Sequence, residues 1–133
     1  MPQKKQRLVT GLELRVMNIV WKLEQATVRE VKNALPKRKP LAYTTVLTVM
    51  RVLERKGFLR HETMNRTYVY YPTVTREEVM ESSLRHLANR LFDGSPELLV
   101  VHVLESQELS PDELRRLKQL ITSKERERRG QTH

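Results

Sequence analysis

The sequence LAYTTVLTVMRVLERKG at residues 41–57 is the stretch that decides the fold, because its two faces differ in chemistry. Apolar residues recur at the i, i+3, i+4 and i+7 spacing of one helical face, and they are Val46, Val49, Met50 and Leu53. Polar residues fall on the opposite face, and they are Thr44, Thr48, Arg51 and Arg55. We therefore expect one face of this helix to join a core and the other to meet water or a binding partner.

Capping boxes mark the starts of other helices. In such a box a Ser or Thr is followed three residues later by Glu, and the two side chains satisfy free backbone amides of the first turn. The boxes are Thr10 with Glu13, Thr27 with Glu30, Thr75 with Glu78, and Ser110 with Glu113. The first two predict helices over about 11–24, with Trp21 as the largest core side chain, and over about 28–35.

A β-hairpin is predicted after the central helix, which Gly57 is well placed to end in a left-handed C-cap. The segment FLRHETMNRTYVYYP, residues 58–72, contains β-formers in TYVYY and turn residues in MNR. Tyr68 and Tyr70 fall on one side of their strand, where core packing is favoured over a stacking platform for single-stranded nucleic acid. Three helices followed by a hairpin predict a winged helix-turn-helix DNA-binding domain at residues 8–72.

The second half, residues 75–123, is predicted to be a helical dimerisation domain, which makes the fold mainly α with a small β-hairpin. Gly94 should end one helix, and the Ser-Pro pairs at 95–96 and 110–111 should begin two more. A lone three-helix module could not cover the apolar segment PELLVVHVLES and would need a second copy. The residues expected at the dimer interface are Leu87, Leu91, Leu98, Val101, Leu104, Leu117 and Ile121. Residues 124–133 are expected to form a flexible charged tail.

The balance of charge divides the chain in the same way. Residues 1–73 carry 15 basic and 5 acidic side chains, a net charge of +10, whereas residues 74–133 carry 10 and 11, a net charge of −1. A basic half joined to a near-neutral half indicates that the first half meets a polyanion.

Several classes of function have no residues to support them. The chain has no cysteine, and its four histidines do not cluster at ligand spacing, so we expect neither a metal site nor a cofactor. It also has no Gly-rich phosphate loop and no nucleophile elbow, so no catalytic residues are predicted and an enzyme is not expected. No apolar run approaches the roughly 18 residues of a membrane span, so we expect a soluble, cytoplasmic protein without membrane insertion.

The outward face of the central helix is the candidate contact with duplex DNA. Arg and Thr side chains can meet guanine edges, phosphates and thymine methyls, and a helix fits the major groove. The candidates are Tyr43, Thr44, Thr45, Thr48, Arg51 and Arg55, together with Arg66 at the hairpin tip. Lys5 and Arg7 of the N-terminal arm and Lys39 of the PKRKP connector should add sequence-independent attraction. Two alternatives stay open: a winged-helix module that binds a protein, and a non-specific nucleic-acid-binding protein.

The segments ELRVMNIVW, AYTTVLTVMRVLERKGFL, YVYYP and LFDGSPELLV resemble, in this order and spacing, the penicillinase-repressor family of BlaI/MecI-type repressors. The resemblance covers about residues 8–122. It implies a homodimeric winged-helix repressor that binds dyad-symmetric operators, with Thr44, Thr45 and Thr48 where the family reads its operator. It also implies control of genes for a cell-wall or antibiotic response.

The resemblance implies a route of release as well. In the antibiotic-resistance members, a membrane-bound sensor protease leads to cleavage of the repressor at an Asn-Phe bond in the fifth helix. The aligned bond here joins His102 to Val103, which departs from that pattern. The cysteine-rich motif of copper-responsive relatives is missing, so copper sensing is not expected. Ala42 stands where some relatives have a serine cap, so we expect a weaker start to the central helix.

Overall fold

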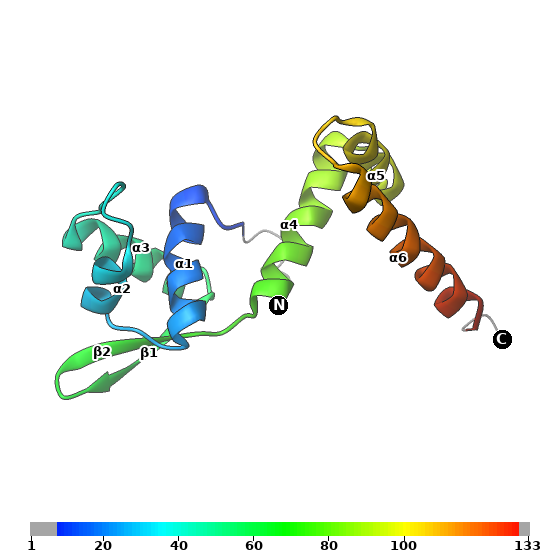
Figure 1. Cartoon of the computed structure of the whole chain (residues 1–133). Helices are drawn as coiled ribbons and strands as arrows, with labels where there is room; N and C mark the ends of the chain where they lie inside the picture. The colour runs from blue at the N-terminus through cyan, green and yellow to red at the C-terminus, as the bar shows by residue number, and fades with distance from the viewer. Residues whose placement is uncertain (1–7, 131–133) are drawn as a thin grey trace. The chain divides into compact units, whose positions relative to one another are not determined.

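The structure, a computed structural model, describes residues 8–130 and divides the chain into two compact units (Figure 1). The first unit extends to His86, and the second begins at Leu87. Within the described residues the elements are α1 (Gly11–Leu23), α2 (Val28–Ala34), α3 (Tyr43–Arg55), β1 (Leu59–Met64), β2 (Thr67–Pro72), α4 (Arg76–Leu91), α5 (Pro96–Glu105) and α6 (Pro111–Gly130). The prediction of a mainly α fold with a winged helix-turn-helix and a small hairpin is confirmed.

The boundary between the two units lies inside α4, whereas the sequence predicted domains that meet between residues 72 and 75. The first turns of α4 belong to the first unit because Val79, only 7% exposed, is part of its core. The indole nitrogen of Trp21 also donates a 2.9 Å hydrogen bond to the carbonyl of Val74. The chain is therefore held against the first unit on its way into α4.

All four predicted capping boxes are formed, which explains where α1, α2, α4 and α6 begin. In α1 the Thr10 hydroxyl accepts from the Glu13 amide at 3.2 Å, and the Glu13 carboxylate accepts from the Thr10 amide at 3.0 Å. The same reciprocal pair joins Thr27 to Glu30, Thr75 to Glu78, and Ser110 to Glu113. The start of α3 differs, because Ala42 offers no side-chain cap, as the sequence predicted.

The end of α3 is set by Gly57, as predicted. Its φ of 90° lies in the left-handed region, which glycine adopts at little cost. The amide of Phe58 donates to the carbonyl of Leu53, and the amide of Gly57 donates to the carbonyl of Glu54, both at 2.9 Å. These two bonds form a Schellman motif, which turns the chain out of α3 and into β1.

The core of the first unit is built from α1, α2, α3, the base of the hairpin and the first turns of α4. The apolar face predicted for residues 46–53 is buried within it. Tyr70 is the largest of its fully buried side chains, so the prediction that Trp21 would be the largest was wrong. Trp21 is only half-buried, because its indole nitrogen bonds to the carbonyl of Val74 at the edge of the core.

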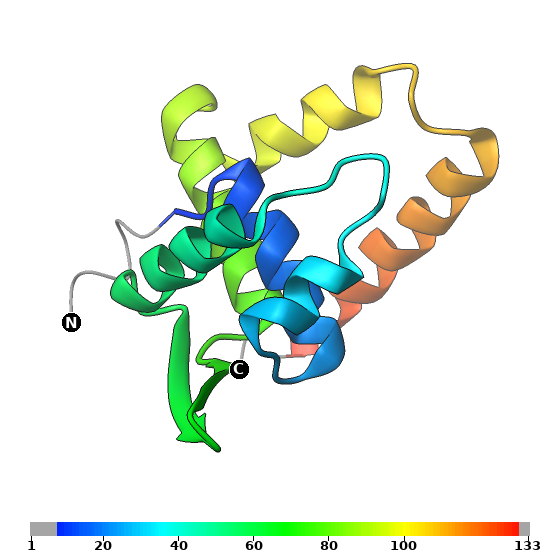
Figure 2. The ribbon, with the colours of Figure 1, turned by 90° about the vertical axis from the view of Figure 1, so that its left-hand side faces the viewer.

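The hairpin has a loop of two residues. Met64 pairs with Thr67, so Asn65 and Arg66 alone make the turn, with φ values of 53° and 66°. Two consecutive residues with positive φ are what a type I′ turn requires, and the predicted turn at MNR is confirmed. Figure 2 shows the hairpin projecting beyond the helices of the first unit. Its base is fixed by two backbone hydrogen bonds between Tyr70 and Ala26, of 3.0 and 2.8 Å.

The second unit contains the end of α4 together with α5 and α6. Gly94, with a φ of 73°, follows the end of α4, and the Ser95 hydroxyl caps α5, as predicted. The expected flexible tail is instead helical as far as Gly130. Residues 124–129 are all Lys, Glu or Arg, which are good helix formers, and Lys124 lies 3.7 Å from Glu127 in an i, i+3 ion pair. The charged segment therefore extends α6.

Candidate nucleic-acid interface

The outward face of α3 is exposed, while the opposite face is buried in the core. The exposed side chains are Tyr43, Thr44, Thr48, Arg51 and Arg55, and Tyr43 at the first position is 40% exposed. Thr45 is half-buried, and Leu47 packs against the core. The division of faces predicted from the sequence is thus present, and five of the six predicted α3 residues are accessible to a partner.

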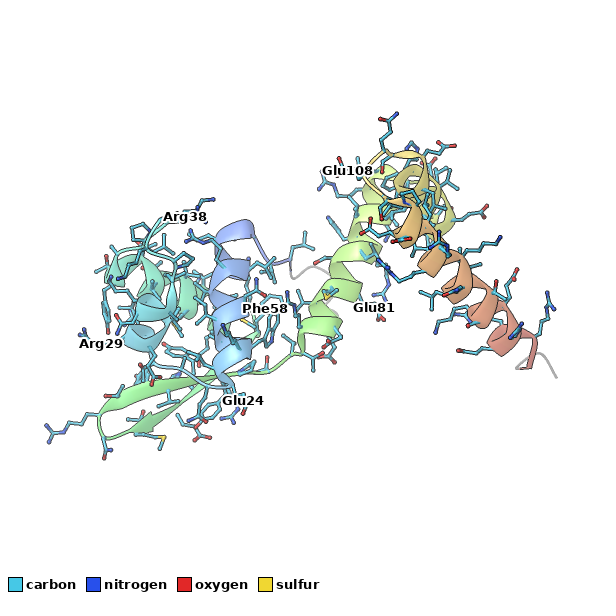
Figure 3. The ribbon with its side chains drawn as sticks, in the orientation of Figure 1. Glu24, Arg29, Arg38, Phe58, Glu81 and Glu108 are labelled. Carbon is cyan, nitrogen blue, oxygen red and sulfur yellow. The ribbon has the colours of Figure 1, made fainter. Side chains whose placement is uncertain are left out.

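Arg29 of α2 joins this face, although nothing in its sequence position predicted it. The carbon at the centre of its guanidinium lies 5.6 Å from the centre of the Tyr43 ring, a cation–π contact. Figure 3 shows the Arg29 side chain pointing away from the body of the first unit, so its charge remains available to a ligand. No local pattern signals this contact, because only the fold brings α2 and the start of α3 together.

The basic connector between α2 and α3 is held by a residue of α1. The Arg15 guanidinium donates a 2.5 Å hydrogen bond to the carbonyl of Lys39, whose own amide donates to the carbonyl of Pro36 at 3.1 Å. The side chains of Lys37, Arg38 and Lys39 are exposed, and Arg38 is labelled in Figure 3. The connector therefore presents three cations on a backbone that Arg15 keeps in place.

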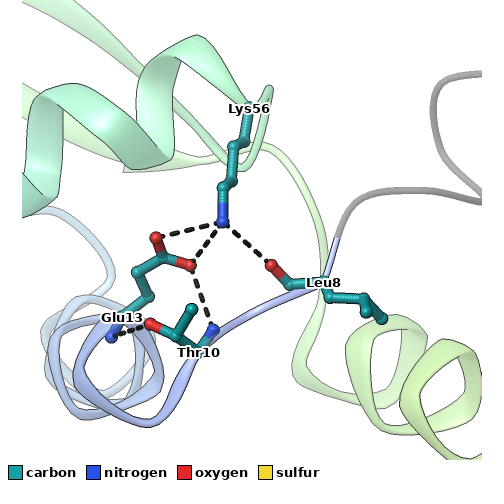
Figure 4. A network of polar contacts seen from close by, with 4 residues as sticks. All are labelled: Leu8, Thr10, Glu13 and Lys56. Carbon is teal, nitrogen blue, oxygen red and sulfur yellow. Dashed lines mark hydrogen bonds and ion pairs between the residues drawn. The ribbon is translucent and has the colours of Figure 1, made fainter.

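The C-terminal end of α3 is tied to the start of α1 by an ion pair (Figure 4). The Lys56 ammonium lies 2.9 and 3.0 Å from the two carboxylate oxygens of Glu13, and it donates to the carbonyl of Leu8 at 3.1 Å. Glu13 is 8% exposed and also closes the capping box with Thr10. One buried carboxylate thus caps α1 and holds the end of the candidate DNA-contacting helix.

The hairpin carries the second part of the candidate interface. Arg66 at its tip is exposed, and Tyr68 close to the tip is 47% exposed. The prediction of core packing is right for Tyr70, which is 1% exposed, but wrong for Tyr68. Tyr68 lies too near the tip to reach the core, and its ring stacks on His61 with the ring centres 3.9 Å apart.

The base of the hairpin and α3 share one electrostatic environment. Burial raises the pKa of the Tyr70 hydroxyl above its ordinary value, and the Glu54 carboxylate raises it further. The guanidinium of Arg51 acts on this pKa in the opposite direction. The positive charge of Arg51, on the outward face of α3, therefore influences the ionisation of the buried Tyr70 at the base of the hairpin.

Comparison with known proteins identifies the family. The family model described as penicillinase repressor matches residues 9–123. The chain belongs to the penicillinase-repressor family. It is 30% identical over 118 residues to the penicillinase repressor of Bacillus licheniformis, a match that covers 89% of this chain and 92% of that protein. It is 25% identical over 116 residues to the methicillin resistance regulatory protein MecI of Staphylococcus aureus (strain N315), a match that covers 87% of this chain and 94% of that protein. It is 36% identical over 96 residues to the transcriptional regulator BlaI of Mycobacterium tuberculosis (strain CDC 1551 / Oshkosh), a match that covers 71% of this chain and 70% of that protein.

Membership of the penicillinase-repressor family makes this chain a DNA-binding transcriptional repressor and not an enzyme, as the sequence predicted. Among residues 8–130, no group of three or more His, Asp or Glu side chains could hold a metal ion. No helix in that range is long and apolar enough to cross a membrane. The predicted arm residues Lys5 and Arg7 lie outside the described part of the chain.

The second unit of this penicillinase-repressor chain exposes the apolar residues predicted for the dimer interface. Those that are exposed are Leu87, Leu91, Leu98, Val101, Leu104 and Ile121, and Leu117 is half-buried. His102 and Val103, where the resemblance places the expected cleavage, also lie there, in α5, and both are exposed. The His102 ring lies 5.4 Å from that of Phe92, measured between ring centres.

Proposed function

We propose that this chain represses transcription by binding operator DNA as a homodimer, with α3 in the major groove of each half-site. The observation that carries the proposal is the division of α3, whose residues from Val46 to Leu53 form a buried face opposite the exposed Thr48 and Arg51. A helix fits the major groove with one face toward the bases. The net charge of +10 on residues 1–73 supports a polyanionic partner for this unit.

The exposed residues divide between base edges and the DNA backbone. Thr44, Thr48 and Arg51 are assigned to base edges, because Arg can donate two hydrogen bonds to guanine and Thr can contact thymine methyls. Tyr43 and Thr45 lie at the start of α3, where free amides favour phosphate. The residues assigned to phosphates elsewhere are Arg29, Lys39, Arg55 and Arg66, together with the arm residues Lys5 and Arg7.

The dimer is assigned to the second unit, because α5 and α6 contain no buried residues of their own. Exposed apolar side chains such as Leu98, Val101 and Leu104 need a partner, and a second copy of the same unit supplies matching apolar surface. Two copies related by a two-fold axis bind a dyad-symmetric operator. The half-site centres are then about 10 base pairs, or a small multiple of that, apart.

A binding titration tests the base-reading role of α3. Fluorescence anisotropy would compare a dyad-containing promoter fragment from the chain's own locus with random duplex of equal length. Arg51→Ala should weaken operator binding by about 1–3 kcal/mol and change random binding little. Arg126→Ala, which removes an exposed arginine of α6, is the matched control and should bind like the wild type. Equal losses on both DNAs would reject base reading by Arg51.

The same titration separates the two alternative functions. A winged-helix module that grips a protein would show no steep salt dependence on duplex DNA. A non-specific nucleic-acid-binding protein would show the salt dependence but no preference for the operator. Under our proposal both properties appear, and Lys5→Ala lowers the slope of log affinity against log salt by about 1.

Release from DNA is assigned to cleavage of α5 by a sensor-dependent protease, at the bond between His102 and Val103. Both side chains are exposed, and a cut there would detach Leu104 and all of α6 from the apolar surface assigned to the dimer. A repressor of this kind acts in the cytoplasm, where the chromosome lies. Mass spectrometry of the chain from induced cells would detect fragments that end at His102, and an intact chain under induction would reject this route.

A further inference from the structure

His61 of β1 lies between the candidate DNA-contacting helix and the hairpin. Its Nδ1 atom is 2.9 and 2.7 Å from the two carboxylate oxygens of Glu54, near the end of α3. An ionised carboxylate can only accept hydrogen bonds, so Nδ1 carries the hydrogen and donates it. The histidine therefore joins the hairpin to α3 through a directed polar contact.

The His61 ring also connects this contact to the outer part of the hairpin. It stacks on Tyr68 with the ring centres 3.9 Å apart and the planes 13° apart, and it lies 5.6 Å from the ring of Tyr70. Tyr68 and Tyr70 meet edge to face at 6.3 Å. Because Tyr70 is buried and bonded to Ala26, the stack has a fixed base in the core of the first unit.

Tyr68 is the exposed end of this stack. It pairs with Thr63 in the register that brings Met64 opposite Thr67, so it lies one pair from the turn of Asn65 and Arg66. Alternation along a strand places Tyr68 on the same side as the buried Tyr70, which is the side toward the helices. A phenol held rigidly here, beside an exposed arginine, can donate a hydrogen bond to a phosphate.

We propose that Tyr68 is a contact to the DNA backbone and that His61 is the positioning residue that holds it in register with α3. This inference rests on the proposed function. Glu54 fixes His61, His61 fixes the Tyr68 ring, and the angle between the hairpin and α3 follows from both. The distance between the backbone contact of the hairpin and the base contacts of α3 is thereby fixed. A fixed distance allows both contacts to form at once only on duplex DNA with a matching groove width.

The charged and titratable groups around the His61 ring come from both elements packed against it. They are Glu54 of α3 and Tyr68 and Tyr70 of β2. Arg60 and Glu62, its neighbours on β1, point to the other side of the strand and pair with each other at 2.8 Å.

The test measures operator affinity of the full-length chain by anisotropy in a double-mutant cycle of His61→Gln and Tyr68→Phe. His61→Gln removes the ring that holds Tyr68, so operator affinity should fall severalfold. Adding Tyr68→Phe to His61→Gln should then cost much less than Tyr68→Phe alone, because the phenol is no longer held in place. His86→Gln, on α4, is the matched control and should keep the wild-type affinity.

A second variant tests the contact itself. Tyr68→Phe retains the stacking ring and loses only the hydroxyl, so operator affinity should fall about tenfold or more, the contribution of one hydrogen bond to a charged phosphate, while the urea unfolding curve stays unchanged. If the wild type binds the operator but the losses from His61→Gln and Tyr68→Phe simply add, or Tyr68→Phe keeps its affinity, this inference is overturned and the proposed function stands. If the wild type shows no preference for the operator, the proposed function itself fails, and the inference falls with it.

Discussion

At the scale of single residues, Glu13 shows how one side chain connects the fold to the candidate site. Its carboxylate caps α1 and pairs with Lys56 just beyond the end of α3. Glu13→Ala removes both interactions, so the Thr10 amide and the Lys56 ammonium lose the carboxylate at a half-buried site. We expect the free energy of unfolding to fall by about 2–3 kcal/mol, as measured by urea unfolding followed by circular dichroism.

Glu30 supplies the matched control, because it closes the same kind of capping box on α2 but is exposed, with no ion pair among the contacts seen for it. Glu30→Ala should cost only about 1 kcal/mol, the contribution of a cap. Similar losses for the two variants would mean that the pair between Glu13 and Lys56 adds nothing to stability.

At the scale of elements, Tyr70 fixes the hairpin to the helices, and its titration gives a test at alkaline pH. Its pKa in the folded state is raised above 10.0 by burial and by Glu54, so folding favours the neutral phenol. The stabilisation is complete below the pKa of the unfolded chain and is lost as the pH rises through the higher pKa of the folded chain. Urea unfolding between pH 8 and pH 11 should therefore show a steeper loss of stability in the wild type than in Tyr70→Phe.

The exposed tyrosine of α3 offers the control for this measurement. Tyr43→Phe should lose stability with rising pH as the wild type does, because Tyr43 is not part of the buried anchor. Parallel stability curves for the wild type and Tyr70→Phe would show that ionisation of Tyr70 is not linked to unfolding.

Elements were predictable from the sequence wherever their ends depend on nearby residues. The box of Thr10 and Glu13, the glycine at position 57 and the turn at Asn65 and Arg66 all act within a few residues of chain, and each was predicted. The prediction of a flexible tail was wrong for residues 124–130. Its charge suggested a tail, but Lys, Glu and Arg are also good helix formers and extend the helix that begins at Pro111.

Contacts between elements could not be predicted in this way. Arg29 meets Tyr43, Arg15 holds the carbonyl of Lys39, and His61 bonds to Glu54 only after folding has brought separate elements together. Tyr68 shows the same limit, because alternation along a strand gives its side of the hairpin but not how far the core extends toward the tip. The outward face of α3 was predictable because its own spacing defines it.

At the scale of the whole molecule, the two units have complementary properties. The first has a continuous buried core and carries the positive charge, whereas α5 and α6 of the second are near neutral in composition and contain no buried residues. Under the proposed function, a single first unit covers one half-site. Linking two of them through the second unit would make the second binding event effectively intramolecular and raise affinity for a dyad by about 100-fold or more.

Val101 lies in the middle of α5, among the exposed apolar side chains assigned to the dimer. Val101→Glu would place a charge in that interface, where it could neither pair nor reach water, so the dimer should dissociate. Sedimentation equilibrium should then report a monomer, and anisotropy should report operator affinity lower by about 100-fold, with binding to random DNA much less affected. Glu105→Gln, at the exposed end of the same helix, is the control and should remain dimeric. A Val101→Glu variant that stays dimeric and well folded would place the interface elsewhere, and a monomer that keeps full operator affinity would show that dimerisation does not drive recognition.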